Sequence, residues 1–337
     1  MLTISIPTFN RSNRLGKNLH DLLREILLSK NKKNINVYIS DNGSPDDTAL
    51  VVKKYSAIYN ANLIPMTFDL WPENRGFDEN IICCYEHCTT EYLWFLSDDD
   101  NVIPGAIDLI IHDIKTISAN VLFYNFNQSP YGLKSPLMKE KILYFTCETH
   151  EAISKIIHWP KLSSIVIKKG CGKSGANLLQ LSGADSQGFM HVALALQTVF
   201  DDGKLLLSNN FIAYPDTDYM DQINFTPYIF NCLNVLVYNL FYKNGKEHLY
   251  PALGLRKVNP LNHSLLWLSK FYLGAMVLTP SLRDEMSLMV KKELQAKSFL
   301  KSKPHISILA MAIFCFAYIY YYCRKVLTGK DVSRLRI

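Results

Sequence analysis

The chain has 337 residues, of which 36 are basic and 30 acidic, giving a formal net charge of +6. Apolar residues make up 48% of the sequence, so there is ample chain for a buried core, and no internal repeat or low-complexity tract is present. The charge suits anionic headgroups or a diphosphate-linked ligand, and we expect no nucleic-acid partner.

The N-terminal part of the chain alternates between strand and helix patterns. Leu2–Ile6 is predicted to be a short apolar strand that ends at Pro7–Arg11. A helix is predicted next, because apolar residues between Leu15 and Leu27 recur at helical spacing. The second predicted strand, Ile35–Ser40, runs into the polar stretch Asp41–Thr48. Such alternation with short connections indicates a parallel sheet with right-handed crossovers.

The polar stretch after the second strand predicts the start of another helix. Ser44 and Asp47 resemble a capping box, and Pro45 would occupy the first helical position. We expect this helix to continue to about Tyr59, and Met66–Leu70 to form a third strand.

A third helix is predicted after Asn74–Asp78. Its inward positions are predicted to be Phe77, Ile81, Cys84, Tyr85 and Cys88. The eight cysteines of the chain show none of the usual zinc-site spacings. We therefore expect Cys83, Cys84 and Cys88 to be reduced thiols of a cytosolic protein. Strand residues begin at Leu2 without a preceding apolar signal region, so we expect no signal peptide.

The stretch Glu91–Ala106 is the most informative part of the sequence. A run of large apolar residues, typical of a strand buried on both faces, stops at Asp98, Asp99 and Asp100. Pro104-Gly105 then breaks the chain and opens a helix. Ligands of parallel sheets bind beyond the carboxyl ends of the strands, and adjacent carboxylates are usually held together by a hard divalent cation.

Two other interpretations of the three acids were considered. A solvated acidic turn would need no ligand at all. An EF-hand loop would need a glycine and alternating polar ligands, but Val102 and Ile103 occupy that part of the loop.

Four motifs in register resemble those of family 2 glycosyltransferases. They are SIPTFNR at the first strand, ISDNGSPDDT after the second, NRGFDEN before the third helix and FLSDDD before Pro-Gly. The resemblance covers residues 1–110. It implies the α/β GT-A nucleotide-diphospho-sugar transferase fold, a mainly parallel sheet flanked by helices. It also implies an inverting, metal-dependent hexosyl- or deoxyhexosyltransferase, closest to abequosyltransferase-like enzymes that build bacterial O-antigen or capsule.

The resemblance assigns roles to residues of the donor side. Pro7 and Phe9 would line the nucleobase, and Asp41 would accept a hydrogen bond from it. Asp99 matches the principal ligand of a divalent metal, Mn²⁺ or Mg²⁺. Asp98 or Asp100 would contact the ribose or a metal-bound water, and we assign Asp98 to the substrate and Asp100 to the metal. The chain departs from the family pattern at Ser97, which stands in place of the first acid.

The family also places an acid before a helix on the acceptor side, as general base. Asp185 follows a Ser-Gly-Ala turn and precedes a helix pattern, so it is our candidate for the base. The simpler interpretation of Asp185 is a helix N-cap. Asp201 and Asp202 are alternatives that read more naturally as a turn. His191 is interpreted as a histidine on the face of that helix.

The middle of the chain carries further predicted elements. They are a strand at Asn120–Phe126, a loop at Gln128–Glu140, a strand at Ser163–Lys169, a basic surface loop at Lys168–Gly175 and a last strand at Lys204–Tyr214. The basic loop lacks the spacing of a phosphate-binding Walker motif.

We predict a catalytic domain at residues 1–219, with a nucleotide-sugar half at 1–110 and an acceptor half at 111–219. Residues 220–337 are predicted to form a C-terminal helical region. Its segment Ile306–Cys323 has 18 residues without a charge, and cations flank it. We expect a monotopic or re-entrant segment at the cytoplasmic face of the bacterial inner membrane. A single span and a buried core helix are the alternatives.

The predicted function is therefore transfer of a sugar from a nucleotide-diphosphate sugar to a lipid-linked oligosaccharide at the membrane surface. Two other functions stay open at this point. A sugar-phosphate nucleotidylyltransferase has a related sheet, but its first loop should be glycine-rich. A catalytically degenerate membrane assembly protein is argued against by Asp41, Asp99 and Asp185.

Overall fold

The computed structural model of the chain describes residues 1–126, 141–144, 150–158, 161–170, 188–201 and 203–215, together with Leu240 and Gly245. All of them fall in the first of two compact units, formed by Met1–Phe225 and Ile229–Arg256. The predicted segment Ile306–Cys323 lies outside the described residues, as does most of the predicted C-terminal region. No helix within the described ranges is long and apolar enough to span a bilayer.

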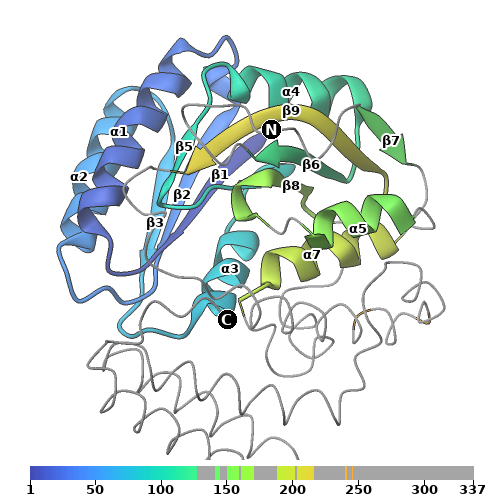
Figure 1. The fold of residues 1–337 in the computed structure, drawn as a ribbon. Helices are drawn as coiled ribbons and strands as arrows, with labels where there is room; N and C mark the ends of the chain where they lie inside the picture. The colour runs from blue at the N-terminus through green and yellow to red at the C-terminus, as the bar shows by residue number, and fades with distance from the viewer. Residues whose placement is uncertain are drawn as a thin grey trace, which may run out of the picture. The chain divides into compact units, whose positions relative to one another are not determined.

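The described strands form one mixed sheet in the order β3-β2-β1-β4-β8-β6-β9-β5, with β7 paired to β9 (Figure 1). Their bounds are β1 Leu2–Thr8, β2 Ile35–Asp41, β3 Met66–Leu70, β4 Tyr92–Phe95, β5 Asp100–Val102, β6 Val121–Phe126, β7 Ile142–Tyr144, β8 Ile165–Lys168 and β9 Leu205–Pro215. Strands β3, β2, β1 and β4 are parallel, whereas β8 joins β4 and β6 in antiparallel fashion. Strand β9 is parallel to β6 and antiparallel to β5 and β7.

Helices cover both faces of the sheet (Figure 1). One layer holds α1 Ser12–Leu28, α2 Thr48–Ala61 and α4 Ala106–Ile117, and the other holds α3 Phe77–Glu86, α5 His150–His158 and α7 Met190–Phe200. Two short 3₁₀ turns, Lys32–Asn34 and Leu162–Ser164, lead into β2 and β8.

The alternation of side chains along the strands explains the two layers. Leu2, Ile4 and Ile6 of β1 belong to the core that packs against α1, α2 and α4. Ser5, on the opposite face, approaches the Cys84 carbonyl of α3 at 3.5 Å. Burial of each large aliphatic side chain contributes about 1.5–3 kcal/mol, so this core dominates the stability of the donor half.

Most predicted elements of the first half are confirmed within a few residues, including the helix after Pro104-Gly105. The predicted capping box is wrong. Helix α2 begins at Thr48 rather than at Pro45, and the N-cap residue Asp47 makes no side-chain cap hydrogen bond. The Ser44 hydroxyl instead donates to Oδ1 of Asp41, at 2.5 Å, because the buried Asp41 carboxylate lies directly behind the turn.

Two further expectations for the helices are corrected. Phe77 was expected to point inward, but 42% of it is exposed at the first position of α3. Helix α5 and the short strands β5 and β7 were not predicted. Each short strand has only three residues and is held by pairing with β9, which local periodicity cannot reveal.

Candidate active site at the carboxyl ends of β1, β2 and β4

Three loops meet where β1, β2 and β4 end. The register pairs Thr8 with Asp41, and the Leu96 amide donates to the Ser5 carbonyl at 2.9 Å. Because these strands are parallel, the residues that follow them are brought to the same edge of the sheet. The predicted donor-side residues therefore lie in neighbouring loops.

Asp98 and Asp99 are joined by the guanidinium of Arg11. Nη1 of Arg11 lies 3.0 Å from Oδ1 of Asp98 and 2.6 Å from Oδ2 of Asp99. Thr8 Oγ1 donates to the other oxygen of Asp98 at 2.7 Å, and Ser97 Oγ donates to Oδ1 of Asp99 at 2.5 Å. The end of β1 and the loop that follows it thus supply a hydroxyl and a cation to the acids that follow β4.

Asp100 is held separately by Ser163. Ser163 Oγ donates to Oδ2 of Asp100 at 2.6 Å and accepts from the Ser97 amide at 2.9 Å. The Asp100 carbonyl accepts from Nδ2 of Asn18 at 2.5 Å. Ser163 lies just before β8, so a residue 63 positions after Asp100 in the chain holds the acidic loop in place.

The acids are not a solvated turn, because Asp98 is only 5% exposed and Asp100 only 8%. Burial raises the pKa of Asp98 to about 6, against the opposing charge of Arg11. Burial, together with the charge of Asp99, raises the pKa of Asp100 to about 7. Both carboxylates are therefore costly to keep ionised unless a further cation approaches.

Carboxylate oxygens are the ligand type that a hard divalent cation prefers, but the oxygens of these three acids do not converge on one point. Asp98 and Asp99 offer carboxylate oxygens, and the charge of Arg11 already occupies the place between them. The side chain of Asp99 is 21% exposed against 7% for Asp98, so Asp99 is the more accessible ligand. Among the described residues, the three acids do not form a group whose ligand atoms all converge, and Asp100 faces Ser163 instead.

The predicted nucleobase residues lie at the ends of β1 and β2. Pro7 is buried within β1, and Phe9, which follows that strand, is 38% exposed. Asp41 is 2% exposed, and its Oδ1 accepts from both the amide and the hydroxyl of Ser44. Burial raises the pKa of Asp41, whereas the Ser44 hydrogen bonds oppose that shift.

Sequence reasoning missed a second wall beside Asp41. The Trp71 amide donates to the Asp41 carbonyl at 2.9 Å, and the Arg75 guanidinium lies 3.7 Å from the centre of the Trp71 ring. Gly43 has φ +74°, and a Cβ there would lie 2.5 Å from the Glu73 carbonyl carbon. The ISDNG and NRGFDEN motifs follow β2 and β3, which are adjacent strands, and this pattern could have predicted the contact.

The acceptor side is only partly described, and Asp185 and Asp202 lie outside the described residues. The N-cap interpretation of Asp185 is wrong for α7, since this helix begins at Met190 and Phe189 occupies the cap position. Asp201 follows the other end of α7 and accepts from Nε2 of Gln197 at 2.9 Å.

Asp78, in the first turn of α3, caps α7 from outside. Its carboxylate accepts from the Gly188 amide at 3.0 Å and from the Met190 amide at 3.2 Å. His191 is buried and lies edge-on to Phe77, with ring centres 6.2 Å apart. The motif before α3 therefore reaches the start of the acceptor-side helix, a role that its local pattern did not indicate.

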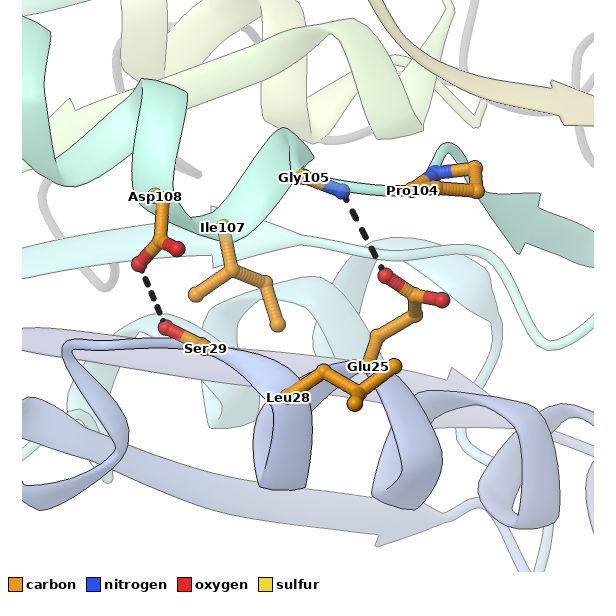
Figure 2. A pocket seen from close by; sticks show the side chains of 7 residues that line it. All are labelled: Glu25, Leu28, Ser29, Pro104, Gly105, Ile107 and Asp108. Atoms are coloured by element: carbon orange, nitrogen blue, oxygen red, sulfur yellow. Dashed lines mark hydrogen bonds between the residues drawn. The ribbon is translucent and has the colours of Figure 1, made fainter.

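A separate pocket between α1 and α4 contains none of the predicted site residues (Figure 2). Ser29 Oγ donates to Oδ1 of Asp108 at 2.6 Å, and the Gly105 amide donates to Glu25 Oε2 at 3.4 Å. These bonds satisfy polar groups where α1 docks against the start of α4, so the pocket is part of helix packing.

Residues 3–163 match the model of a family described as glycosyl transferase family 2. Crystal structures of S. aureus TarS 1–349 share the fold. One aligns at TM-score 0.53 and 14% identity, covering 98% of this chain and 92% of that one. Another, in complex with UDP-GlcNAc, aligns at TM-score 0.54 and 14% identity, covering 94% and 89%. No curated protein matches this sequence.

Proposed function

We propose that this chain, whose residues 3–163 match glycosyl transferase family 2, moves a sugar from a nucleotide-diphosphate sugar to a lipid-linked saccharide, with inversion at the anomeric carbon. The observation that carries the proposal is the arrangement of Thr8, Arg11, Asp98 and Asp99 at the carboxyl ends of β1 and β4. It joins an acidic loop to a cation in the part of a parallel sheet where nucleotides bind.

On the donor side, Asp41 is suited to accept a hydrogen bond from a nucleobase N–H. Ser44 holds the Asp41 carboxylate through two hydrogen bonds, so the acceptor is oriented before the donor arrives. Phe9, which follows β1, offers an exposed aromatic surface, and Pro7 lies one residue before the end of β1, in register with Ser40. TarS was crystallised with UDP-GlcNAc, which makes this the first donor to test.

Asp98 and Asp99 are proposed to hold Mn²⁺ or Mg²⁺, with Asp100 as a further candidate. When bound, the cation would stabilise the negative charge that gathers on the departing diphosphate. Thr8 and Ser97 orient the carboxylates, and the charge of Arg11 opposes the rise in the pKa of Asp98 that burial causes. Arg11 is 29% exposed on its side chain, so it can also approach an anionic substrate.

On the acceptor side, Asp185 is proposed to take the proton from the attacking hydroxyl. A single displacement needs one base and no protein nucleophile. Asp78 holds the backbone at Gly188 and Met190, only a few residues after Asp185, through the bonds described above. We infer that this contact helps to set the position of the base.

We propose a lipid-linked acceptor of O-antigen or capsule synthesis, at the cytoplasmic face of the bacterial inner membrane. The support is the apolar segment Ile306–Cys323 with its flanking cations. Truncation after Ser302 should abolish sedimentation with membranes and reduce transfer to a lipid-linked acceptor more than to a short soluble analogue. A full-length protein that stays out of the membrane fraction would contradict this location.

The test of the reaction is a screen of nucleotide sugars for thermal stabilisation in the presence of Mn²⁺, followed by assay of sugar release. One donor should raise the melting temperature and be turned over slowly in water. The Asp99→Asn protein should lose both effects. If no nucleotide sugar binds or is hydrolysed, the chain is a degenerate transferase and the proposed function is wrong.

A further inference from the structure

A second cluster of metal-ligating side chains lies outside the proposed transfer site. Asp69 of β3, Cys83 of α3 and His87, which follows α3, each offer one ligand atom, and these atoms all lie within 4.8 Å of one another. In the described part of the chain, this is the single group of three such side chains. The proposed function uses none of these three residues.

Local geometry explains why these residues meet. Cys83 and His87 are four residues apart, so the turn of α3 places both side chains on one face of the helix. Tyr38 points toward α3 because it alternates with Val37 and Ile39, which belong to the core on the opposite face. Asp69 lies on the adjacent strand, in register with Ser40. The cluster therefore fills the gap between α3 and the β2–β3 edge.

The distances within the cluster suit tetrahedral coordination. Cys83 Sγ is 3.9 Å from Oδ2 of Asp69, and it lies within 4.8 Å of the ligand nitrogen of His87. Nε2 of His87 is 3.3 Å from the same oxygen of Asp69. Ligands bonded to one zinc ion at about 2.0–2.3 Å stand roughly 3.3–3.8 Å apart. Small adjustments would bring all three within bonding distance of a common ion.

Each ligand atom also has a partner that orients it. Nδ1 of His87 lies 3.0 Å from the Cys83 carbonyl, so a proton on Nδ1 turns the lone pair of Nε2 toward Asp69. Tyr38 Oη donates to Oδ2 of Asp69 at 2.6 Å and lies 3.1 Å from Cys83 Sγ. The Tyr38 ring stacks parallel to the His87 ring at 5.3 Å. Such outer partners are typical of metal sites.

Two simpler arrangements fit less well. A protonated His87 paired with Asp69 would satisfy the ion pair, but that pair does not need the Cys83 thiol, which contacts both residues. A cysteine nucleophile would need access to substrate, and Cys83 is only 4% exposed. The side chains of Asp69 and His87 are 44% and 53% exposed, so an ion can reach these two ligands from solvent and then bind the buried sulfur of Cys83.

We propose that Asp69, Cys83 and His87 bind a divalent cation of the zinc type, with the fourth position open to water or to Tyr38. A mixed sulfur, nitrogen and oxygen donor set favours such an ion over Mg²⁺, which prefers oxygen alone. The ion joins the end of α3 to β3 and so holds the helix that carries Asp78 against the sheet. Thiolate formation at Cys83 would accompany binding, with release of its proton.

The test uses full-length protein that has been chelated and then titrated with Co²⁺, a spectroscopic substitute for zinc. We expect near-ultraviolet absorption from thiolate-to-cobalt charge transfer, and displacement of that absorption by Zn²⁺. Cys83→Ser should abolish it. The matched control Cys88→Ser changes another buried cysteine near the end of α3 and should keep the absorption. Asp99→Asn should keep it as well, which separates this site from the proposed carboxylate site.

A second variant covers the case in which Cys83→Ser does not fold. His87→Gln alters an exposed residue and should weaken Zn²⁺ affinity at least about tenfold, the scale for loss of a ligand or its support. His20→Gln, on the exposed side of α1, is its control. Three results would overturn the proposed site. The absorption could be absent from the wild type, it could persist in Cys83→Ser, or His87→Gln could bind Zn²⁺ as tightly as the wild type does. Sugar-transfer assays are independent of these readings.

Discussion

The N-terminal region of residues 1–126 and the later region of residues 141–215 are built in different ways. In residues 1–126, consecutive strand and helix units give the parallel run β3-β2-β1-β4. In residues 141–215, β8 pairs in antiparallel fashion with β4, β7 pairs in antiparallel fashion with β9, and α7 is buried along its whole length. The first half places its functional residues in loops at one sheet edge, whereas the second half supports that edge through long-range contacts.

Several hydrogen bonds join these two regions at the site. Ser163 donates to Asp100, and Asp78 accepts from the amides that start α7. The comparison teaches that donor binding should depend on the first half, and turnover on both. Changes at the proposed donor-binding residues should alter donor affinity and catalysis together, while changes on the acceptor side, or at the contacts between the two regions, should alter turnover alone.

The largest effect is expected at the acid loop. Asp99→Asn should lower turnover roughly a thousandfold, because a principal charge on the diphosphate side is lost. Donor affinity measured by calorimetry should fall as well, and chelation by EDTA should mimic the loss, with recovery in Mn²⁺ or Mg²⁺.

The melting temperature of Asp99→Asn should stay near wild type, since Asp99 is partly exposed and its neighbours retain their own hydrogen bonds. Glu91→Gln, an exposed acid before β4, is the control and should be active. Full turnover in EDTA would disprove the metal assignment.

The next effect is expected on the acceptor side. Asp185→Asn should reduce kcat about a hundredfold, the usual scale for loss of a general base. Donor affinity should be unchanged, because the assigned role concerns the acceptor hydroxyl. Steady-state kinetics and donor calorimetry check the two halves separately. A variant that no longer binds the donor would instead assign Asp185 to the first half.

A smaller effect is expected at the contact between Asp78 and the start of α7. Asp78→Ala removes the acceptor for two amides at the start of α7, and loss of such a cap costs about 1 kcal/mol. We expect kcat to fall about tenfold with little change in donor affinity. Glu79→Gln, one residue further along α3 and exposed, should behave like wild type. If kcat falls equally in Asp78→Ala and Glu79→Gln, then the loss comes from a change in α3 and not from the contact of Asp78 with α7.

The smallest effect concerns stability and pH in the absence of metal. The pKa values of Asp98 and Asp100 are raised by burial to about 6 and about 7, so the folded state binds more protons than the unfolded state between about pH 4 and 7. Stability contributed by these groups therefore falls as pH rises through that window.

Urea unfolding in EDTA at pH 5 and pH 6 measures this contribution. Asp100→Asn should reduce the pH dependence by about 1 kcal/mol relative to wild type, because it removes one of the two raised carboxyls. The comparison with wild type cancels the contributions of histidines elsewhere. A variant that shows the same slope as wild type would mean that Asp100 is ionised in the fold at no cost.

The sequence by itself determined the elements whose signal is local. The alternation in β1, the helical spacing in α1 and the unbroken apolar run of β4 depend on burial of a continuous face, which neighbouring residues encode. The same short stretches also gave the position of the three acids after β4 and the resemblance to a known family. The capping box at Ser44 failed because a distant acceptor, Asp41, took the hydroxyl.

Only the tertiary structure decided which side chains meet. Arg11 contacts Asp98 and Asp99 from the loop between β1 and α1, which is distant from them in sequence. Ser163 contacts Asp100 from the turn before β8. Asp69 joins the pair Cys83 and His87 only because β3 lies beside β2 under α3. These contacts depend on strand order and register, which periodicity along the chain does not specify, because pairing energies come from partners that are far apart in sequence.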